Sequence, residues 1–165
     1  MSMPKTALAL TLLATISIQA ADWPRFRGPN QDGISKEAGV NAKSLEGGAK
    51  FAWKASVGTG FASITIANGR AYTMGNADAK DTVWCLDANK GTELWKFTYD
   101  EELKPNLYEG GPNATPTVDG ERVYTLSKTG RAICFDAAKG TVLWNKELAK
   151  ELGAKKPEWG FSGSV

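Results

Sequence analysis

Few residues of this chain could carry out chemistry. Its 165 residues include no histidine, so neither a Ser-His or Cys-His nucleophile nor a histidine metal site can be built within it. The two cysteines, Cys85 and Cys134, lie 49 positions apart, which makes neither a CxxC pair nor a zinc cluster. We therefore assign no catalytic residue and no metal ligand.

Four carboxylates recur at the same spacing as the cysteines. Asp87 and Asp136 each open a short run that ends at a glycine, and we interpret both as structural turn residues. Glu109 and Glu158 precede stretches that we expect to form inner strands of sheets. One of these glutamates could bind a ligand, but the alternative of a solvated loop carboxylate is favoured.

The common spacing belongs to an internal repeat. The stretch Cys85–Trp95 aligns with Cys134–Trp144, and Cys, Asp, Ala, Lys, Gly, Thr, Leu and Trp match in register with an offset of 49 residues. Upstream, Asn68-Gly69 matches Asp119-Gly120. The chain is thus expected to contain at least two copies of one supersecondary unit.

Each repeat is expected to form four short strands. In the second repeat they are Ala114–Val118, Arg122–Ser127, Arg131–Phe135 and Thr141–Asn145. The Asn-Gly and Asp-Gly pairs supply the positive-φ positions of tight hairpins. Runs such as Val83–Leu86 and Ala132–Phe135 are apolar on both faces, so both faces must be covered. The pattern predicts an all-β fold of β-propeller blades, each made of four antiparallel strands.

A structural motif closes each repeat. It consists of an aspartate, a glycine and a tryptophan: Asp87, Gly91 and Trp95 in the first repeat, and Asp136, Gly140 and Trp144 in the second. We expect each tryptophan to lie on the outermost strand and to point at a neighbouring blade, where burial of a large indole would hold the blades together. Equivalent cysteines of stacked blades lie about 10 Å apart, so buried thiols are favoured over a disulfide.

Residues 1–20 have the pattern of a secretory signal peptide. Lys5 precedes an apolar run that ends near Ile16, and this run is too short to span a bilayer. We expect a periplasmic or secreted protein with no transmembrane segment after removal of the signal. The 20 Lys and Arg residues nearly balance the 18 Asp and Glu residues, so no electrostatic footprint for nucleic acid is present.

The remaining chain divides into an N-terminal segment, 21–50, and a partial propeller, 51–165. Blades are expected at about 60–98 and 111–146, with a third starting near 159. Four blades would need about 196 residues, more than the 145 that follow the signal, so we expect an incomplete ring and a truncated or partial sequence.

Aromatic residues gather in the connections that lead to the expected inner strands. They are Phe61, Tyr108, Trp159 and Phe161. Loops held by a rigid scaffold often carry function, so these rings could form a recognition surface. Packing between blades is the favoured alternative.

The two repeat segments resemble the tryptophan motif of the PQQ-binding-like (quinoprotein alcohol dehydrogenase-like) β-propeller repeat family. The aspartate, glycine and tryptophan match in both copies, whereas Cys replaces the motif's Ala and Lys replaces its Thr. The stretch Asp22–Asn30 looks like the start of secreted bacterial members of that family.

This resemblance implies two possible functions. One is an exported, non-catalytic binding or scaffold module, whose partner would be an unknown protein or small-molecule ligand. The alternative is the N-terminal part of a PQQ-dependent periplasmic dehydrogenase. Members with that activity resemble one another in a vicinal Cys-Cys pair, calcium-binding carboxylates and a catalytic Asp, and this sequence has no Cys-Cys pair. PQQ is thus a cofactor implied by the resemblance alone.

Overall fold

The computed structural model describes residues 21–39, 41, 43, 46–48, 50–105 and 107–165, so the expected signal peptide lies outside the described residues. The regular secondary structure of the described part is almost entirely β-strand. Its elements are β1 (Thr65–Ala67), β2 (Arg70–Ala77), β3 (Lys80–Asp87), β4 (Glu93–Asp100), β5 (Thr117–Asp119), β6 (Arg122–Leu126), β7 (Arg131–Asp136), β8 (Val142–Glu147) and α1 (Leu148–Leu152).

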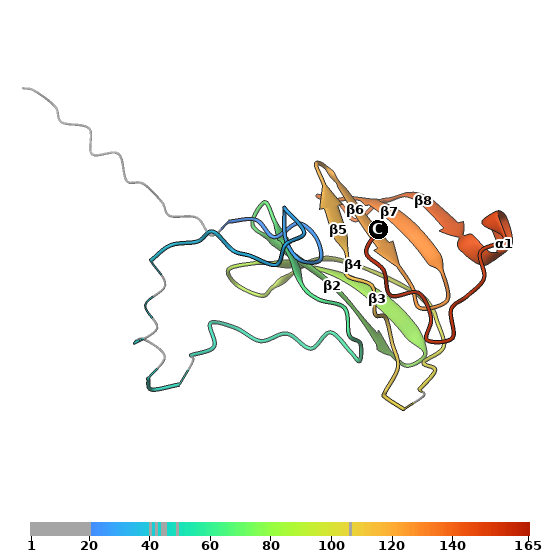
Figure 1. The fold of residues 1–165 in the computed structure, drawn as a ribbon, viewed down its shortest axis with the longest axis horizontal. Coiled ribbons are helices and arrows are strands. Elements are labelled where there is room, and N and C mark those ends of the chain that lie inside the picture. Colours follow the sequence, from blue (N-terminus) through green and yellow to red (C-terminus); the bar gives the residue numbers. More distant parts are fainter. Residues whose placement is uncertain (1–20, 40, 42, 44–45, 49, 106) are drawn as a thin grey trace, which may run out of the picture.

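The strands form two antiparallel sheets of four, each following the order of the chain from its first strand to its last. The sheet β1–β4, green in Figure 1, faces the orange sheet β5–β8. Within the described residues the two sheets form no closed ring. The prediction of an all-β fold built of four-stranded propeller blades is therefore confirmed.

Tight turns fix the register of the first sheet. Asn68 (φ 51°) and Gly69 (φ 72°) join β1 to β2 with both central residues left-handed, as a type I′ turn requires. Asp78 and Ala79 join β2 to β3 in the same way, with φ of 52° and 57°. This second hairpin reaches further than its counterpart between β6 and β7, because the stretch from Tyr72 to Cys85 is three residues longer than the equivalent stretch from Tyr124 to Cys134.

A bulge occurs at the same place in both sheets. The register between the third and fourth strands shifts at Cys85/Leu86 in the first sheet and at Cys134/Phe135 in the second. A bulge increases the local twist of a strand. Both sheets therefore bend where the chain approaches the turn that carries the repeat motif.

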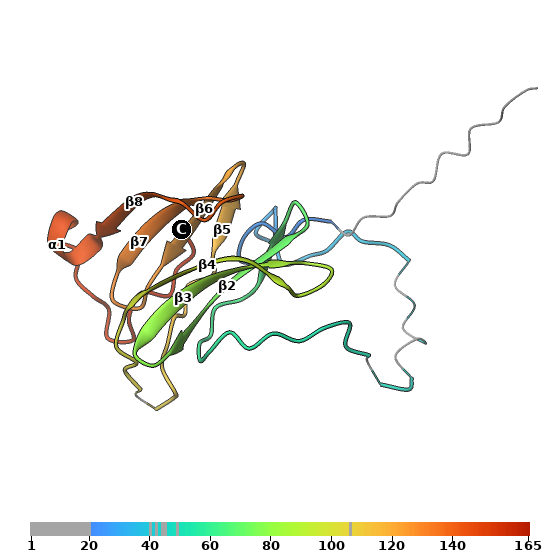
Figure 2. The same cartoon turned by 180° about the vertical axis from the view of Figure 1, so that it is seen from behind.

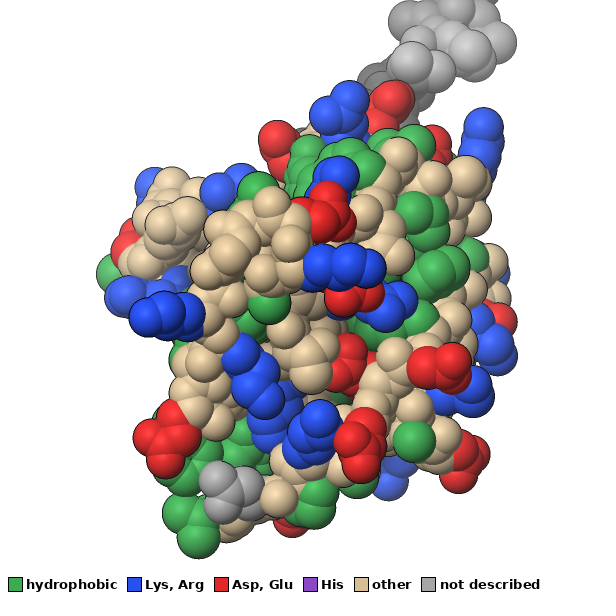
Figure 3. Space-filling model, turned by 90° about the vertical axis from the view of Figure 1, so that its right-hand side faces the viewer, with side chains coloured by type: hydrophobic (Ala, Val, Ile, Leu, Met, Phe, Trp, Pro, Cys, Tyr) green, Lys and Arg blue, Asp and Glu red, His purple; other side chains and the backbone are tan. Residues whose placement is uncertain are grey.

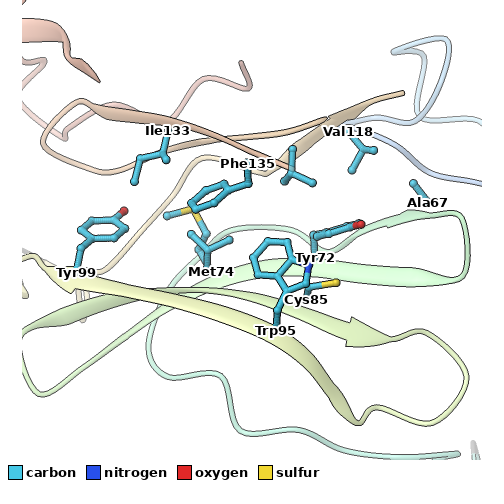
Figure 4. Close-up of a cluster of buried hydrophobic side chains, with 11 residues drawn as sticks. Ala67, Tyr72, Met74, Cys85, Trp95, Tyr99, Val118, Ile133 and Phe135 are labelled. Carbon is cyan, nitrogen blue, oxygen red and sulfur yellow. The ribbon is translucent and has the colours of Figure 1, made fainter. Parts of the chain in front are cut away.

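The main core fills the space between the two sheets (Figure 4). Trp95 of β4 lies against Phe135 of β7, with 5.7 Å between ring centroids. Phe97 approaches the same Phe135 ring edge-on at 5.3 Å. The buried members of the cluster are Ala67, Tyr72, Met74, Val83, Cys85, Trp95, Tyr99, Val118, Val123, Ile133 and Phe135. Residues of one repeat thus complete the core of the other.

The N-terminal segment, here residues 21–39, joins the inner strands of both sheets. The backbones of Trp23 and Ile66 exchange two hydrogen bonds of 2.7 and 3.0 Å. The Val118 N–H, in β5, donates to the carbonyl of Pro24 at 2.7 Å. Figure 2 shows this segment in blue beside the β1–β2 end of the first sheet.

After β8 the chain forms the short helix α1, which ends at Gly153 in a left-handed conformation (φ 66°). The helix lies in the stretch 146–156, which is rich in lysine and glutamate, and none of the helix residues is buried. Among the described residues, no helix combines the length and apolar character needed to cross a membrane.

Candidate binding surface

The two motif aspartates are occupied by local turn hydrogen bonds. The Asp87 carboxylate accepts from the N–H groups of Asn89 and Lys90, both at 2.9 Å. The Asp136 carboxylate accepts from the corresponding N–H groups of its own turn at 3.0 and 2.8 Å. Each aspartate stabilises a turn between the third and fourth strands. Neither side chain extends into a cavity that the structure describes.

The motif glycines lie beneath indole rings. Gly140 has a φ of 70°, and a Cβ atom built on it would lie 2.6 Å from the ring of Trp95. The Trp95 Nε1–H donates to the carbonyl of Ala137 at 3.0 Å, so the ring is fixed across the space between the sheets. Trp53 lies in the same way over Gly91 and donates to the carbonyl of Ala88 at 3.1 Å. The sequence Phe51–Lys54 resembles the outer-strand sequence Leu94–Phe97, and Trp53 accordingly occupies the position over the first turn that Trp95 occupies over the second.

Trp144 has a different environment from Trp95. Trp95 is 8% exposed, whereas Trp144 is 38% exposed and contacts Tyr124 of its own sheet at a centroid distance of 6.0 Å. The neighbouring Leu143 is 51% exposed. The outer face of the second sheet therefore presents an indole without a glycine turn beneath it.

Both cysteines are free and fully buried within their sheets. Cys85 is paired in register with Tyr72, and Cys134 with Tyr124. Burial raises the pKa of the Cys85 thiol to about 11, and burial also raises the pKa of Cys134. Because the thiolate is the reactive form, both groups are poor nucleophiles in the folded protein.

A cavity of about 180 Å³ lies between three connections: the one that follows β4, the turn between β6 and β7, and the one that follows α1. It is lined by Glu101, Glu102, Lys104, Pro105, Lys128, Thr129, Lys156, Glu158 and Trp159. Three lysines and three glutamates line it, and two of the glutamates are engaged: Glu102 pairs with Lys104 at 3.4 Å, and Glu101 accepts from the Thr129 hydroxyl at 2.9 Å. Glu158 lines this cavity, whereas Glu109 is exposed and does not.

Three aromatic rings form a row beside this cavity, which we call the aromatic row: Phe61, Tyr108 and Trp159. The Phe61 and Tyr108 rings meet edge-to-face at 5.1 Å, and Tyr108 lies 6.3 Å from Trp159. Phe61 is 53% exposed and Trp159 is 45% exposed. The row therefore brings together three connections and leaves two of its rings open to a partner.

A lysine and an asparagine hold the central ring of the row. The Lys128 ammonium lies 4.6 Å from the centroid of Tyr108 and donates to the carbonyl of Lys104 at 3.0 Å. The Asn113 amide donates to the Tyr108 hydroxyl at 3.3 Å, and this hydrogen bond lowers the pKa of the phenol. Both contacts fix the orientation of Tyr108 at the mouth of the cavity.

The fourth aromatic residue predicted for this cluster lies elsewhere. Phe161 packs over Gly130 and against a smaller apolar cluster that includes Ala114, Leu126 and Ala132. Figure 3 views the molecule from the side of β8 and α1, where lysine, arginine and carboxylate side chains are interspersed rather than separated by sign.

A buried polar network near the cavity was not predicted from the sequence. The Asp81 carboxylate is 1% exposed and accepts from the Asn76 amide at 2.7 Å and from the Tyr99 hydroxyl at 3.4 Å. Burial raises the pKa of Asp81 to about 6. The Asn76 amide also donates to the carbonyl of Glu101, a residue that lines the cavity. Asn76 and Asp81 belong to the β2–β3 hairpin, and the greater length of this hairpin relative to β6–β7 was the one feature of the sequence that set this region apart.

Comparison with known proteins gives one family and several similar structures. A family model described as "Outer membrane protein assembly factor BamB" matches residues 37–157. No curated protein sequence matches the chain. A quinohemoprotein alcohol dehydrogenase from Comamonas testosteroni is similar over 88% of this chain and 22% of its own, with 21% identity and a TM-score of 0.62.

Two further structures resemble smaller parts of the chain. BamB from Moraxella catarrhalis is similar over 51% of this chain and 22% of its own, with 20% identity and a TM-score of 0.39. A quinohemoprotein alcohol dehydrogenase from Pseudomonas putida HK5 covers 58% of this chain and 14% of its own, with 25% identity and a TM-score of 0.45. The chain spans about a fifth of the length of the first two structures, and the Comamonas likeness establishes the fold alone.

Proposed function

The chain belongs to the PQQ-like repeat family whose model is described as outer membrane protein assembly factor BamB, and from this premise we propose that it is a non-catalytic binding module. The proposed module is part of an exported propeller that acts in the periplasm or outside the cell. Its blades serve as a rigid support, and the connections between them bind a protein partner.

The aromatic row carries this proposal. Phe61, Tyr108 and Trp159 come from three separate connections, yet their rings form one continuous row beside a charged cavity. Aromatic side chains are enriched at protein interfaces because they bury a large area at a low cost in conformational entropy. The cavity has lysines and glutamates in equal number, which suits a peptide with both charges rather than nucleic acid.

The alternative is the N-terminal part of a PQQ-dependent dehydrogenase, and the cavity beside the aromatic row does not fit that cofactor. This cavity is about 180 Å³, below the roughly 300–1,000 Å³ of typical ligand pockets. The described residues also contain no cluster of three or more acidic, cysteine or histidine side chains that could hold a calcium ion beside it. We therefore derive no redox step for this chain.

Panning of a peptide library on the full chain tests the binding role. We expect selected peptides to lose binding to the Trp159→Ala and Phe61→Ala variants, since each removes one open ring of the row. Phe51→Ala is the matched control, because Phe51 is 74% exposed and lies outside the row. Peptides that bind all four proteins equally would contradict the proposed surface.

Mixing the chain with PQQ and calcium separates the two functions. A binding module leaves the absorbance spectrum of PQQ unchanged and does not reduce a dye when alcohol is added. A saturable spectral change together with dye reduction would instead support the dehydrogenase.

A further inference from the structure

The Asp81 carboxylate is buried and has few hydrogen-bond donors. It accepts from the Asn76 amide and the Tyr99 hydroxyl, and it forms no ion pair in the part of the chain that the structure describes. A carboxylate can accept about four hydrogen bonds, so two donors leave it incompletely satisfied. The side-chain oxygen of Asn76 is also buried, and no group donates to it. One proton on Asp81 would correct both deficits, because a carboxylic acid donates a hydrogen bond that a carboxylate cannot.

Asn76 joins two of the connections that carry the aromatic row. Its backbone exchanges two hydrogen bonds of 2.7 and 2.8 Å with the backbone of Thr59, two residues before Phe61. Its side-chain amide donates to the carbonyl of Glu101 at 2.8 Å, at the start of the connection that leads to Tyr108. The orientation of this one amide group therefore decides whether the second connection is tied to the first.

The ionisation state of Asp81 sets that orientation. While Asp81 is ionised, the amide nitrogen of Asn76 has two acceptors, the Asp81 carboxylate at 2.7 Å and the Glu101 carbonyl at 2.8 Å. A protonated Asp81 instead donates to the amide oxygen, which requires the amide to rotate by about half a turn. The amide oxygen then faces the Glu101 carbonyl, and two acceptors without a hydrogen between them repel. Protonation of Asp81 thus removes the donor of Glu101.

The charged groups around Asp81 do not neutralise it. The nearest carboxylate is that of Glu101, and the guanidinium of Arg131 in β7 lies over the Tyr99 ring, 5.1 Å from its centroid. At the surface of the hairpin, the side chains of Lys80 and Asp100 pair with each other. Burial is the largest cause of the raised pKa of Asp81, about 6, and the negative charge of Glu101 adds to it. The proton is therefore exchanged in a mildly acidic range.

We propose that Asp81, Asn76 and the Glu101 carbonyl form a proton-operated latch on the connection that carries Tyr108, so that acidification regulates the aromatic row. The regulatory part rests on the binding role proposed above for this row. The latch is closed while Asp81 is ionised, and it opens as the pH falls below about 6. Loss of the buried charge stabilises the folded chain, so opening is local, and the Glu101 N–H keeps its hydrogen bond of 3.0 Å to the Ala79 carbonyl.

Nuclear magnetic resonance of the full chain between about pH 7.5 and pH 4.5 tests the latch without a binding partner. The Glu102 N–H follows the Glu101 carbonyl in the same peptide group, so its chemical shift reports the hydrogen bond from Asn76. We expect the Glu102 N–H and the Asn76 side-chain N–H signals to shift together, with a midpoint near pH 6.

Hydrogen exchange separates this local opening from unfolding. After correction for the intrinsic effect of pH, the Glu101 N–H should exchange roughly tenfold faster at the acidic end, because one of the two hydrogen bonds that hold Glu101 to the hairpin is lost. Amides of β6 and β7 should exchange more slowly there, since protonation of Asp81 raises the free energy of unfolding.

Three variants identify the group that takes up the proton. Asp81→Asn should give at about pH 7 the signals that the parent chain gives at about pH 5, because the new amide donates as a protonated acid does. Asp78→Asn is the matched control, since Asp78 is an exposed carboxylate of the same hairpin, and it should keep the midpoint of the parent. Glu101→Gln should also keep the transition, at a slightly lower pH.

The latch is overturned if the two signals do not titrate in the parent chain, or if the transition is lost in Glu101→Gln and kept in Asp81→Asn. The parent titration needs no variant, so it decides the outcome even if Asp81→Asn unfolds. Peptides selected on the aromatic row at about pH 7 should bind the parent more weakly at about pH 5, and Asp81→Asn weakly at both. Equal affinity of the parent at both pH values would overturn the regulation, whereas a failed selection contradicts the binding role and leaves the spectra unaffected.

Discussion

The hydrogen atom that takes the place of a side chain at Gly140 determines how closely the two sheets can approach. The Trp95 ring occupies the volume that a Cβ atom would need, and its N–H reaches the carbonyl of Ala137 only from that position. The left-handed φ of 70° adds a second requirement for glycine. At this position the choice of residue therefore controls both the turn and the packing between sheets.

A comparison of alanine substitutions at Gly140 and Gly120 separates these two requirements. Gly140→Ala must strain the backbone and displace the Trp95 ring, so we expect it to lower the free energy of unfolding by about 3 kcal/mol. Gly120→Ala is the control, because Gly120 also has a positive φ (56°) but no atom within 4 Å of the added Cβ. It should cost only about 1 kcal/mol. Urea unfolding of both variants measures the difference, and equal losses would show that the contact with Trp95 contributes nothing.

The buried carboxyl group of Asp81 should make the free energy of unfolding depend on pH. Burial raises its pKa from 3.8 to about 6, so the folded chain binds this proton more tightly than the unfolded chain does. The contribution of Asp81 to stability is therefore greatest below the unfolded pKa and is lost as the pH rises through the window from 3.8 to about 6. A shift of that size corresponds to at most about 3 kcal/mol.

Asp81→Asn removes this titration. We expect the variant to be more stable than the parent chain at about pH 7 and equal to it near pH 4, because the amide mimics the protonated acid. Asp100→Asn is the control for an exposed carboxylate. The Lys80 ammonium lowers the pKa of Asp100, so its small effect has the opposite sign. If Asp81→Asn differs from the parent by the same amount at both pH values, the carboxyl does not titrate in this window.

At the scale of elements, the outermost strand of each sheet has a different role in each repeat. β4 places Trp95 in the core between the sheets, whereas β8 leaves Trp144 and Leu143 exposed. The two strands share the Leu-Trp pair and differ at the other aligned positions, and what packs against them differs as well. A second sheet covers β4, and within the described residues no sheet covers β8.

Alanine substitutions in these two strands should therefore have unequal effects. Trp95→Ala removes a buried ring and a hydrogen bond, and we expect it to lower the free energy of unfolding by about 4 kcal/mol. Trp144→Ala removes a partly exposed ring from the same motif position and should cost about 1 kcal/mol. Thermal unfolding of the two variants provides the measurement. Equal shifts in Tm would mean that Trp144 is also docked in solution.

Local signals in the sequence predicted the strands but not all the contacts between them. Asn68-Gly69 was sufficient for a hairpin, because a type I′ turn requires two left-handed residues in succession. The sequence grouped Phe61, Tyr108, Trp159 and Phe161 in equivalent connections, with packing between blades as the favoured role. Three of these rings form the aromatic row. Phe161 packs on Gly130 instead, a contact that local sequence does not indicate. The partners of Asp81 depend on tertiary placement, and the greater length of the β2–β3 hairpin indicated only where the two repeats differ.

For the whole molecule, we expect the exposed face of β8 to act as an association surface. An outermost strand with apolar side chains offers unpaired backbone groups and hydrophobic area to other chains. We expect concentration-dependent self-association in sedimentation velocity, and Leu143→Lys should reduce it by placing a charge on the face. Ile34→Lys changes a residue that is 63% exposed on the N-terminal segment and should leave association unchanged. Equal association of all three proteins would locate the contact elsewhere.

The hydrogen bonds that join Trp23 to Ile66 near β1–β2 and Pro24 to Val118 of β5 have a consequence for biosynthesis. The partner of Pro24 is Val118, so this link cannot close until nearly a hundred further residues have left the ribosome. Trp23 can pair with Ile66 of β1 earlier, but the carbonyl of Pro24 must wait for a strand that is translated much later.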